Sequence, residues 1–153
     1  MITLRPVTHN DLPLFAGSSY AAMPPEAIRQ MLRESAVKDH GGKFFQLVAV
    51  MDDNCCVGFV SLFALGDGEI SCGPEIKPQY RKQGFASQAV TQAMAYAKTL
   101  GFTKAVAQVR TDNAPSIALH KKLGFSQERE FVNAKGNSVL WFEKALCAPH
   151  LHS

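Results

Sequence analysis

The residues from Arg81 to Ala86 have the composition of a loop that binds a phosphate group. They follow a strand-like run, Glu69 to Ile76, and they open a long amphipathic helix pattern. The first amides of a helix have no internal acceptor, and the aligned peptide dipoles place roughly half a positive charge there. An anion satisfies both, and Gly84, which lacks a Cβ, lets the backbone approach it closely. We therefore predict an anion site at this loop, with Arg81 and, more weakly, Lys82 adding positive charge.

The hydrophobic pattern predicts the elements that hold this loop in place. Apolar residues recur at helical spacing from 86 to 100, and alternating or continuous apolar runs mark strands elsewhere. The predicted order is a strand (2–5), two helices (11–18 and 24–37), three strands (44–51, 55–63 and 69–76), a helix (86–100), a strand (105–110), a helix (113–124) and two strands (125–133 and 138–145). This order predicts an α/β protein, in which a mixed sheet of about seven strands carries four helices. We expect one domain over residues 1–146 and a short C-terminal tail, 147–153.

The strand from 69 to 76 contains two residues that weaken a sheet. Pro74 cannot donate a hydrogen bond to a neighbouring strand, and Gly73 lowers the stability of a strand interior. We predict either a β-bulge or an edge where pairing fails. A bulge with no ligand is the alternative.

Composition excludes several classes of function. The chain has 153 residues and a net charge of +3, which suits an anionic small molecule but lacks the dense basic stripe of a nucleic-acid-binding protein. No apolar run approaches the roughly 18 residues of a membrane span, and residues 1–5 do not have the layout of a signal peptide, so we expect a cytoplasmic protein. None of the four cysteines forms a C-x-x-C pair, and we expect structural thiols and no metal site.

Two motifs resemble a known family. Arg81, Gly84 and Ala86 follow Ile76-Lys77-Pro78, and about thirty residues later come Asn113, Ser116 and Gly124-Phe125. At this spacing they resemble the GNAT superfamily of acyl-CoA-dependent N-acyltransferases. The stretch from Asn113 to Phe125 is similar to the branch that includes ribosomal-protein N-acetyltransferases. The resemblance covers about residues 67–126.

The resemblance implies a cosubstrate, acetyl-CoA, and a place for each of its parts. Its pyrophosphate would lie over the backbone of the loop, which consists of Arg81, Lys82, Gln83, Gly84, Phe85 and Ala86. The pantetheine arm would run beside Glu75 and Ile76, and Asn113 and Ser116 would line the cleft. The thioester would lie where the strands 69–76 and 104–110 part, with the Ile76 amide stabilising the carbonyl oxygen.

N-acylation also needs groups that move protons. An alkylamine with a pKa near ~10.4 is almost entirely protonated at pH 7, so a base is required. Glu69, Ser71 and Glu75 share one face of the strand if no bulge intervenes, and Glu69 is our predicted base. A solvated carboxylate is the alternative interpretation of Glu69.

His120 is our candidate for the acid that protonates the leaving thiolate. It stands where many family members have a tyrosine, and helical spacing puts it on one face with Asn113 and Ser116. The alternative is that His120 only packs against the sheet or the cosubstrate.

The sequence thus predicts an N-acetyltransferase that moves an acetyl group from acetyl-CoA to a primary amine by direct attack. The acceptor would be a small molecule or a protein N-terminus, with no nucleic acid or membrane as partner, and the chain a monomer or a homodimer. A non-catalytic acyl-CoA sensor is the alternative. A nucleotide-binding enzyme is disfavoured because the loop lacks both G-K-[ST] and G-x-G-x-x-G.

Overall fold

A computed structural model describes residues 2–146. In these residues the chain forms seven strands, three α-helices and three short 3-10 helices. In chain order these are β1 (Ile2–Pro6), η1 (His9–Phe15), η2 (Ser19–Ala22), α1 (Pro25–Val37), β2 (Phe45–Asp52), β3 (Cys55–Gly66), β4 (Glu69–Ile76), η3 (Pro78–Tyr80), α2 (Phe85–Thr99), β5 (Lys104–Arg110), α3 (Ala114–Lys122), β6 (Ser126–Val132) and β7 (Ser138–Ala145). None of the helices in this part of the chain combines the length and the apolar character needed to cross a bilayer.

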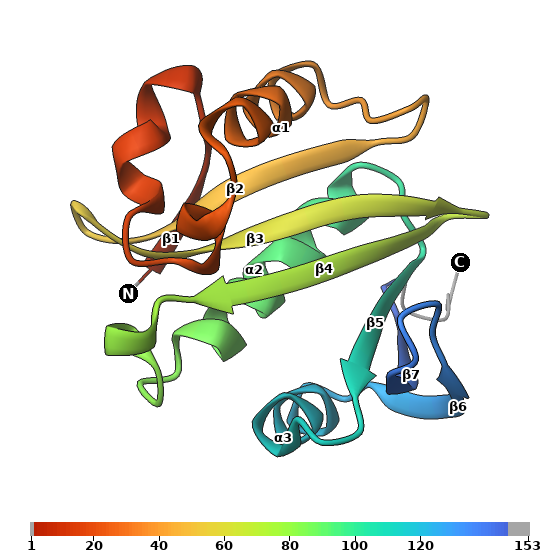
Figure 1. The fold of residues 1–153 in the computed structure, drawn as a ribbon. Helices are drawn as coiled ribbons and strands as arrows, with labels where there is room; N and C mark the ends of the chain where they lie inside the picture. Colours follow the sequence, from red (N-terminus) through yellow and green to blue (C-terminus); the bar gives the residue numbers. More distant parts are fainter. Residues whose placement is uncertain (1, 147–153) are drawn as a thin grey trace.

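The strands form one mixed sheet, which confirms the predicted fold class. Their order is β1-β2-β3-β4-β5-β7-β6, and every neighbouring pair is antiparallel except β4 and β5. Figure 1 shows η1, η2 and α1 on one face of the β1–β4 half and α2 on the other. The sheet therefore lies between two layers of helices on that half.

The parallel pair β4–β5 opens into a gap after three residue pairs. Pairing runs from Glu69 opposite Lys104 to Ser71 opposite Val106 and then ends, although both strands continue. Over the same stretch β4 stays paired with β3, and β5 stays paired with β7. The two halves of the sheet therefore separate, as Figure 1 shows, and α3 lies below the opening.

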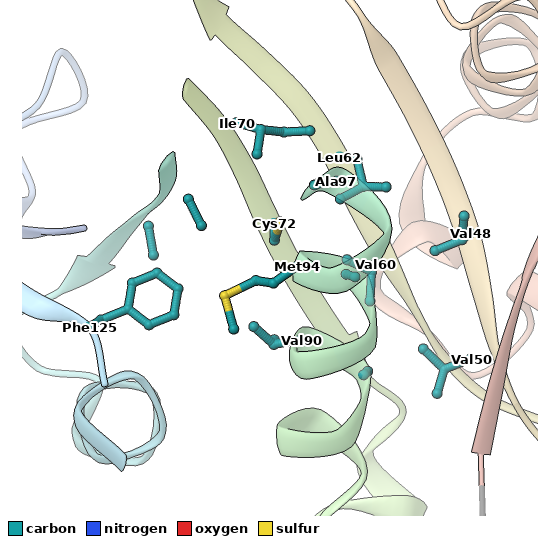
Figure 2. Packing of buried hydrophobic residues seen from close by; sticks show 14 of the residues in the cluster. Val48, Val50, Val60, Leu62, Ile70, Cys72, Val90, Met94, Ala97 and Phe125 are labelled. Atoms are coloured by element: carbon teal, nitrogen blue, oxygen red, sulfur yellow. The ribbon is translucent and has the colours of Figure 1, made fainter. Parts of the chain in front are cut away.

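The core lies mainly between α2 and the sheet. Figure 2 shows Val90 and Met94 of α2 packed among strand residues such as Val60 and Cys72, with Phe125 on the far side. A second cluster on the opposite face places Phe15, Leu32 and neighbours from η1 and α1 against the strands. The first cluster includes Ile70 and Cys72 of β4, whereas the strand residues of the second cluster belong to β2 and β3.

Several predicted details change in the structure. The helix expected over 11–18 is the 3-10 helix η1, which starts two residues earlier and has a complete capping box between Thr8 and Asp11. No register shift occurs at Gly73 or Pro74, so the prediction of an edge where pairing fails is confirmed there and that of a bulge is wrong. The predicted tail, 147–153, with Cys147, lies outside the described residues.

One histidine belongs to the core. His120 is only 2% exposed and packs edge-on against Phe125 and face-on over Phe142. Its Nδ1–H donates to the Ser116 carbonyl over 2.8 Å, while its Nε2 has no hydrogen-bond partner among the described residues. Burial lowers the pKa of His120 below its ordinary value, although the bond to Ser116 opposes that shift. The imidazole is therefore neutral in the native protein at pH 7.

The close packing of β3 against the end of β4 predicts the effect of a methyl group at Gly58. A Cβ there would lie 2.3 Å from the Glu75 carbonyl oxygen and 2.9 Å from the Ile76 Cα. Because backbone atoms cannot move aside cheaply, we expect Gly58→Ala to lower the free energy of unfolding by about 1–3 kcal/mol in urea titrations. Gly73→Ala is the matched control, since its Cβ would come near the Ser61 hydroxyl, at 3.1 Å, which can rotate. Equal losses in both variants would contradict this packing argument.

The buried imidazole predicts how stability depends on pH. Because the pKa of His120 is lower in the native state than in the unfolded state, the unfolded chain takes up the proton first as the pH falls. Stability is therefore retained above the ordinary pKa near ~6.5 and is lost below it, by up to about 1.4 kcal/mol per pH unit for one proton. We expect His120→Leu to show a shallower loss between pH 7 and pH 5 in urea titrations. The other histidines are common to both proteins, so parallel curves would contradict this account.

Candidate active site

The N-terminus of α2 has the features of an anion site. Gly84 is its N-cap residue with φ +83°, a left-handed conformation that glycine adopts at little cost, and Lys82 has φ +62°. No side chain caps this end in the described residues. The first amides of α2 have no intrahelical acceptor, so they are available to an external anion.

Arg81 joins this loop to the end of β4. Its Nε donates to the Ile76 carbonyl over 2.9 Å, and the residue also lines the cleft described below. The sequence predicted a phosphate contact for Arg81. In the structure its Nε also has a structural role, because this hydrogen bond holds the loop against Ile76, the last residue of β4.

A cleft of about 640 Å³ extends from this loop across the gap to α3. Its lining includes three cationic side chains, of Arg81, Lys82 and Lys122, and one carboxylate, that of Glu75. The remaining lining residues are Pro74, Ile76, Tyr80, Gly84, Phe85, Ala86, Ser87, Asn113, Pro115, Ser116, Ala118 and Leu119. The cleft is thus basic around the helix terminus and largely apolar along α3, which suits a ligand with a charged end and an uncharged arm.

The end of β4 presents unpaired backbone to the gap. The Lys77 amide donates to the Val57 carbonyl of β3 over 2.8 Å, so the backbone groups of residue 77 face β3. Backbone direction alternates along a strand, and the groups of Pro74 and Ile76 therefore face the side on which β5 has departed. Pro74 has no N–H, which leaves the amide of Ile76 as the donor at this end of the strand.

Glu75 lies near the open end of β4, and only one of its two carboxylate oxygens accepts a hydrogen bond from the described residues. Its Oε2 accepts a hydrogen bond from the Ser19 amide of η2 over 3.1 Å, whereas its buried Oε1 has no partner among the described residues. Tyr20 stands beside it, and burial, together with the nearby Glu75 charge, raises the pKa of Tyr20 to about 12. The sequence placed Glu75 beside the pantetheine arm and among three candidate bases, but nothing in the sequence indicated its contact with η2.

Glu69, the base predicted from the sequence, lies elsewhere. Its carboxylate is 3.7 Å from the Lys104 ammonium, which also contacts Glu143 at 3.1 Å. Glu69 pairs with Lys104 at the closed end of the two strands, and it is not among the residues that line the cleft. Ser71, the last residue of β4 paired with β5, does not line the cleft either.

α3 presents a different face to the cleft from the one predicted. Asn113 and Ser116 do line the cleft, and the Asn113 side chain accepts from the Ser116 amide over 3.2 Å as the helix cap. His120 points to the core instead, because the side of α3 that carries Ala118, Leu119 and Lys122 faces the cleft. The predicted placement of His120 at the cleft is therefore wrong.

The cleft-facing side of α3 was missed by the sequence analysis. It carries Pro115, Ala118, Leu119 and Lys122, whose spacing of three and four residues is the signal that could have identified it. Lys122 adds a cation on the wall opposite the loop.

The arrangement can hold an anionic ligand at one end and orient a carbonyl group at the other. The described residues contain no cluster of His, Cys, Asp and Glu side chains that could hold a metal ion. Cys72, on β4, is buried, and burial raises the pKa of its thiol to about 12, so it is not available as a thiolate nucleophile.

Comparison with known proteins agrees with this geometry. The family model for the acetyltransferase (GNAT) domain matches residues 1–126. A mouse relative, alpha/beta-tubulin-N-acetyltransferase 9, is 37% identical over 84 residues, which cover 50% of this chain and 34% of the mouse protein. The chain thus matches only about a third of that relative's length.

Two solved structures have the same fold. Spermidine N-acetyltransferase from Vibrio cholerae, in complex with CoA and spermine, superimposes with a TM-score of 0.79 at 18% identity, covering 95% of each chain. Ribosomal-protein-alanine N-acetyltransferase from Brucella melitensis gives a TM-score of 0.79 at 17% identity, covering 94% of this chain and 99% of that one.

The family match spans every element from β1 to α3, including the loop, the gap and the cleft. The resemblance stated from the two motifs is thereby confirmed. The chain belongs to the GNAT family of acetyltransferases.

Proposed function

We propose that this acetyltransferase moves the acetyl group of acetyl-CoA to a primary amine by direct attack in the gap between β4 and β5. The proposal rests on one observation, which is that a strand end and a helix N-terminus with unpaired amides lie in the same cleft. The unpaired end of β4 adjoins the uncapped N-terminus of α2, and one cleft of about 640 Å³ connects them.

Acetyl-CoA fits the chemistry of this cleft. Amides from Gly84 to Ala86 would receive the pyrophosphate, and Arg81, Lys82 and Lys122 would add positive charge. Asn113, Ser116 and the apolar side of α3 would line the course of the pantetheine arm. The Ile76 amide, directed into the gap, would donate to the thioester oxygen as it gains charge.

Direct attack needs no enzyme nucleophile. The thiol of Cys72 is buried with its pKa raised to about 12, which supports a mechanism without an acyl-enzyme. The thiolate of CoA is a tolerable leaving group because an ordinary thiol has a pKa near ~8.5. The proposal therefore does not depend on His120 as the acid.

The proposal takes residues 1–146 as one domain and includes a cytoplasmic location and a monomeric or homodimeric chain. The acceptor is a primary amine on a small molecule or at a protein N-terminus. Spermidine, tubulin and an alanine of a ribosomal protein are the acceptor types suggested by the names of the similar proteins.

A glycine substitution tests the anion site. Gly84→Ala would strain a residue at φ +83° and would add a methyl group to the loop that is proposed to hold the phosphate. We expect CoA affinity, measured by calorimetry, to fall at least tenfold, while unfolding free energy falls by about 1 kcal/mol. Gly101→Ala is the matched control, because it has φ +95° with no atom within 4 Å, follows α2 at its other end, and should cost similar stability but no affinity. Unchanged CoA binding in Gly84→Ala would contradict the assignment of the loop.

Thiol release from acetyl-CoA tests the reaction itself. The wild-type protein is incubated with spermidine, with an alanine-initiated peptide and with a methionine-initiated peptide, and free CoA is measured against a blank without amine. We expect amine-dependent release of CoA with at least one acceptor and an acetylated product by mass spectrometry. Tight CoA binding with no turnover of any amine would favour the sensor alternative.

A further inference from the structure

One carboxylate oxygen at the end of β4 lacks a hydrogen-bond partner among the described residues. Glu75 shares its face of β4 with Glu69 and Ser71, on the side of the sheet covered by η2 and α1. The Ser19 amide holds its Oε2 at 3.1 Å, and its buried Oε1 contacts no hydrogen-bond donor in residues 2–146. A buried acceptor without a donor costs free energy, so a ligand that supplies an N–H at this point is stabilised.

Resting on the function proposed above, we infer that Glu75 receives the acceptor amine as an ammonium ion and is the base that deprotonates it. Glu75 lines the cleft and directly precedes Ile76, whose amide faces the gap. An amine that donates to Oε1 therefore stands next to the position of the thioester carbonyl. The acceptor class is thus a cationic primary amine, approaching from the η2 side of the sheet.

The proton balance of this step is complete. The ammonium gives one proton to Glu75 Oε1, and the neutral nitrogen forms a C–N bond with the thioester carbon. The C–S bond breaks, its electron pair leaves with sulfur, and the second amine proton neutralises the CoA thiolate. Glu75 then releases its proton to water, so the net products are the amide, CoA and one proton.

The groups that surround Glu75 fix its position and do not compete for the proton. Tyr20, from η2, keeps its own proton because burial and the Glu75 charge raise its pKa to about 12. The Arg81 guanidinium donates its Nε–H to the adjoining Ile76 carbonyl. Ser19 supplies a backbone amide, which does not titrate. Glu69 is a weaker candidate because Lys104 already neutralises it at the closed end of the gap.

The pH dependence of Glu75→Gln tests this role. At pH 7 only about one alkylamine in a few thousand is neutral, whereas at pH 9.5 about one in nine is neutral. We expect Glu75→Gln to lower kcat/KM at pH 7 by roughly 10²–10⁴-fold. The deficit relative to wild type should shrink at least tenfold by pH 9.5, because the solution then supplies the neutral amine. The probe is the panel amine that wild type acetylates fastest, and CoA affinity should stay within threefold of wild type.

Two further carboxylate variants decide between rival interpretations. Glu128→Gln, on the exposed surface of β6, removes a charge outside the cleft lining and should keep wild-type kcat/KM at every pH. Glu69→Gln tests the earlier candidate. A deficit in Glu75→Gln that is equal at all pH values, or a pH-dependent deficit in Glu69→Gln alone, would overturn the inference. An inactive wild-type protein would instead contradict the proposed function.

Ser19→Pro tests the same role without altering the carboxylate. It removes the N–H that binds Glu75, and proline fits here because Ser19 is the first residue of η2 and Ser18 is extended (φ −102°, ψ 171°). We expect a several-fold loss of kcat/KM that also shrinks toward pH 9.5, with CoA affinity unchanged. Ser19→Ala keeps the amide, so its kcat/KM at pH 7 should exceed that of Ser19→Pro. Wild-type kcat/KM in Ser19→Pro, or an equal loss in Ser19→Ala, would show that this bond does not position the base.

Discussion

The separation of β4 from β5 is the constraint on which the rest of the site depends. Each strand keeps its outer partner, so the sheet does not unravel, and only the ladder between them ends after Ser71 and Val106. Pro74 has no N–H to donate to β5, so renewed pairing of β5 with this part of β4 would gain less. The separation of the two strands is thereby favoured. The opening therefore exposes backbone groups in the interior of a sheet, where they are normally satisfied by a neighbour.

The gap becomes a binding site because the chain turns directly from it into a helix. After β4 the chain makes one turn of 3-10 helix and enters α2 through Gly84. The bond from Arg81 to the Ile76 carbonyl ties this turn to the strand. Two kinds of unsatisfied amide, at a strand edge and at a helix terminus, are thereby held in one cleft at a fixed spacing. A ligand with separate polar groups at that spacing satisfies both.

The sequence predicted those parts of the site that depend on local pattern. The loop from Arg81 to Ala86 and the weakness at Pro74 follow from residue types at fixed offsets, and the structure has both where they were expected. The predictions failed where position depends on packing between distant segments. His120 is buried in the core, although helical spacing from Asn113 had placed it at the cleft. The contact between Ser19 and Glu75 joins residues that are 56 positions apart.

Strand geometry explains how two neighbouring residues, Glu75 and Ile76, can contact both the amine and the thioester. Side chains alternate between the two faces of a strand, while backbone groups alternate between its two edges. At the end of β4, Glu75 extends its carboxylate toward η2, and Ile76 buries its side chain on the face of β4 that also carries Ile70 and Cys72, while its amide faces the gap. A ligand bound along α2 and α3 and an amine held on the η2 side therefore meet at one peptide unit. Glu69 has the same side-chain direction, but β5 still covers that part of the strand edge, so no ligand can reach the backbone beside it.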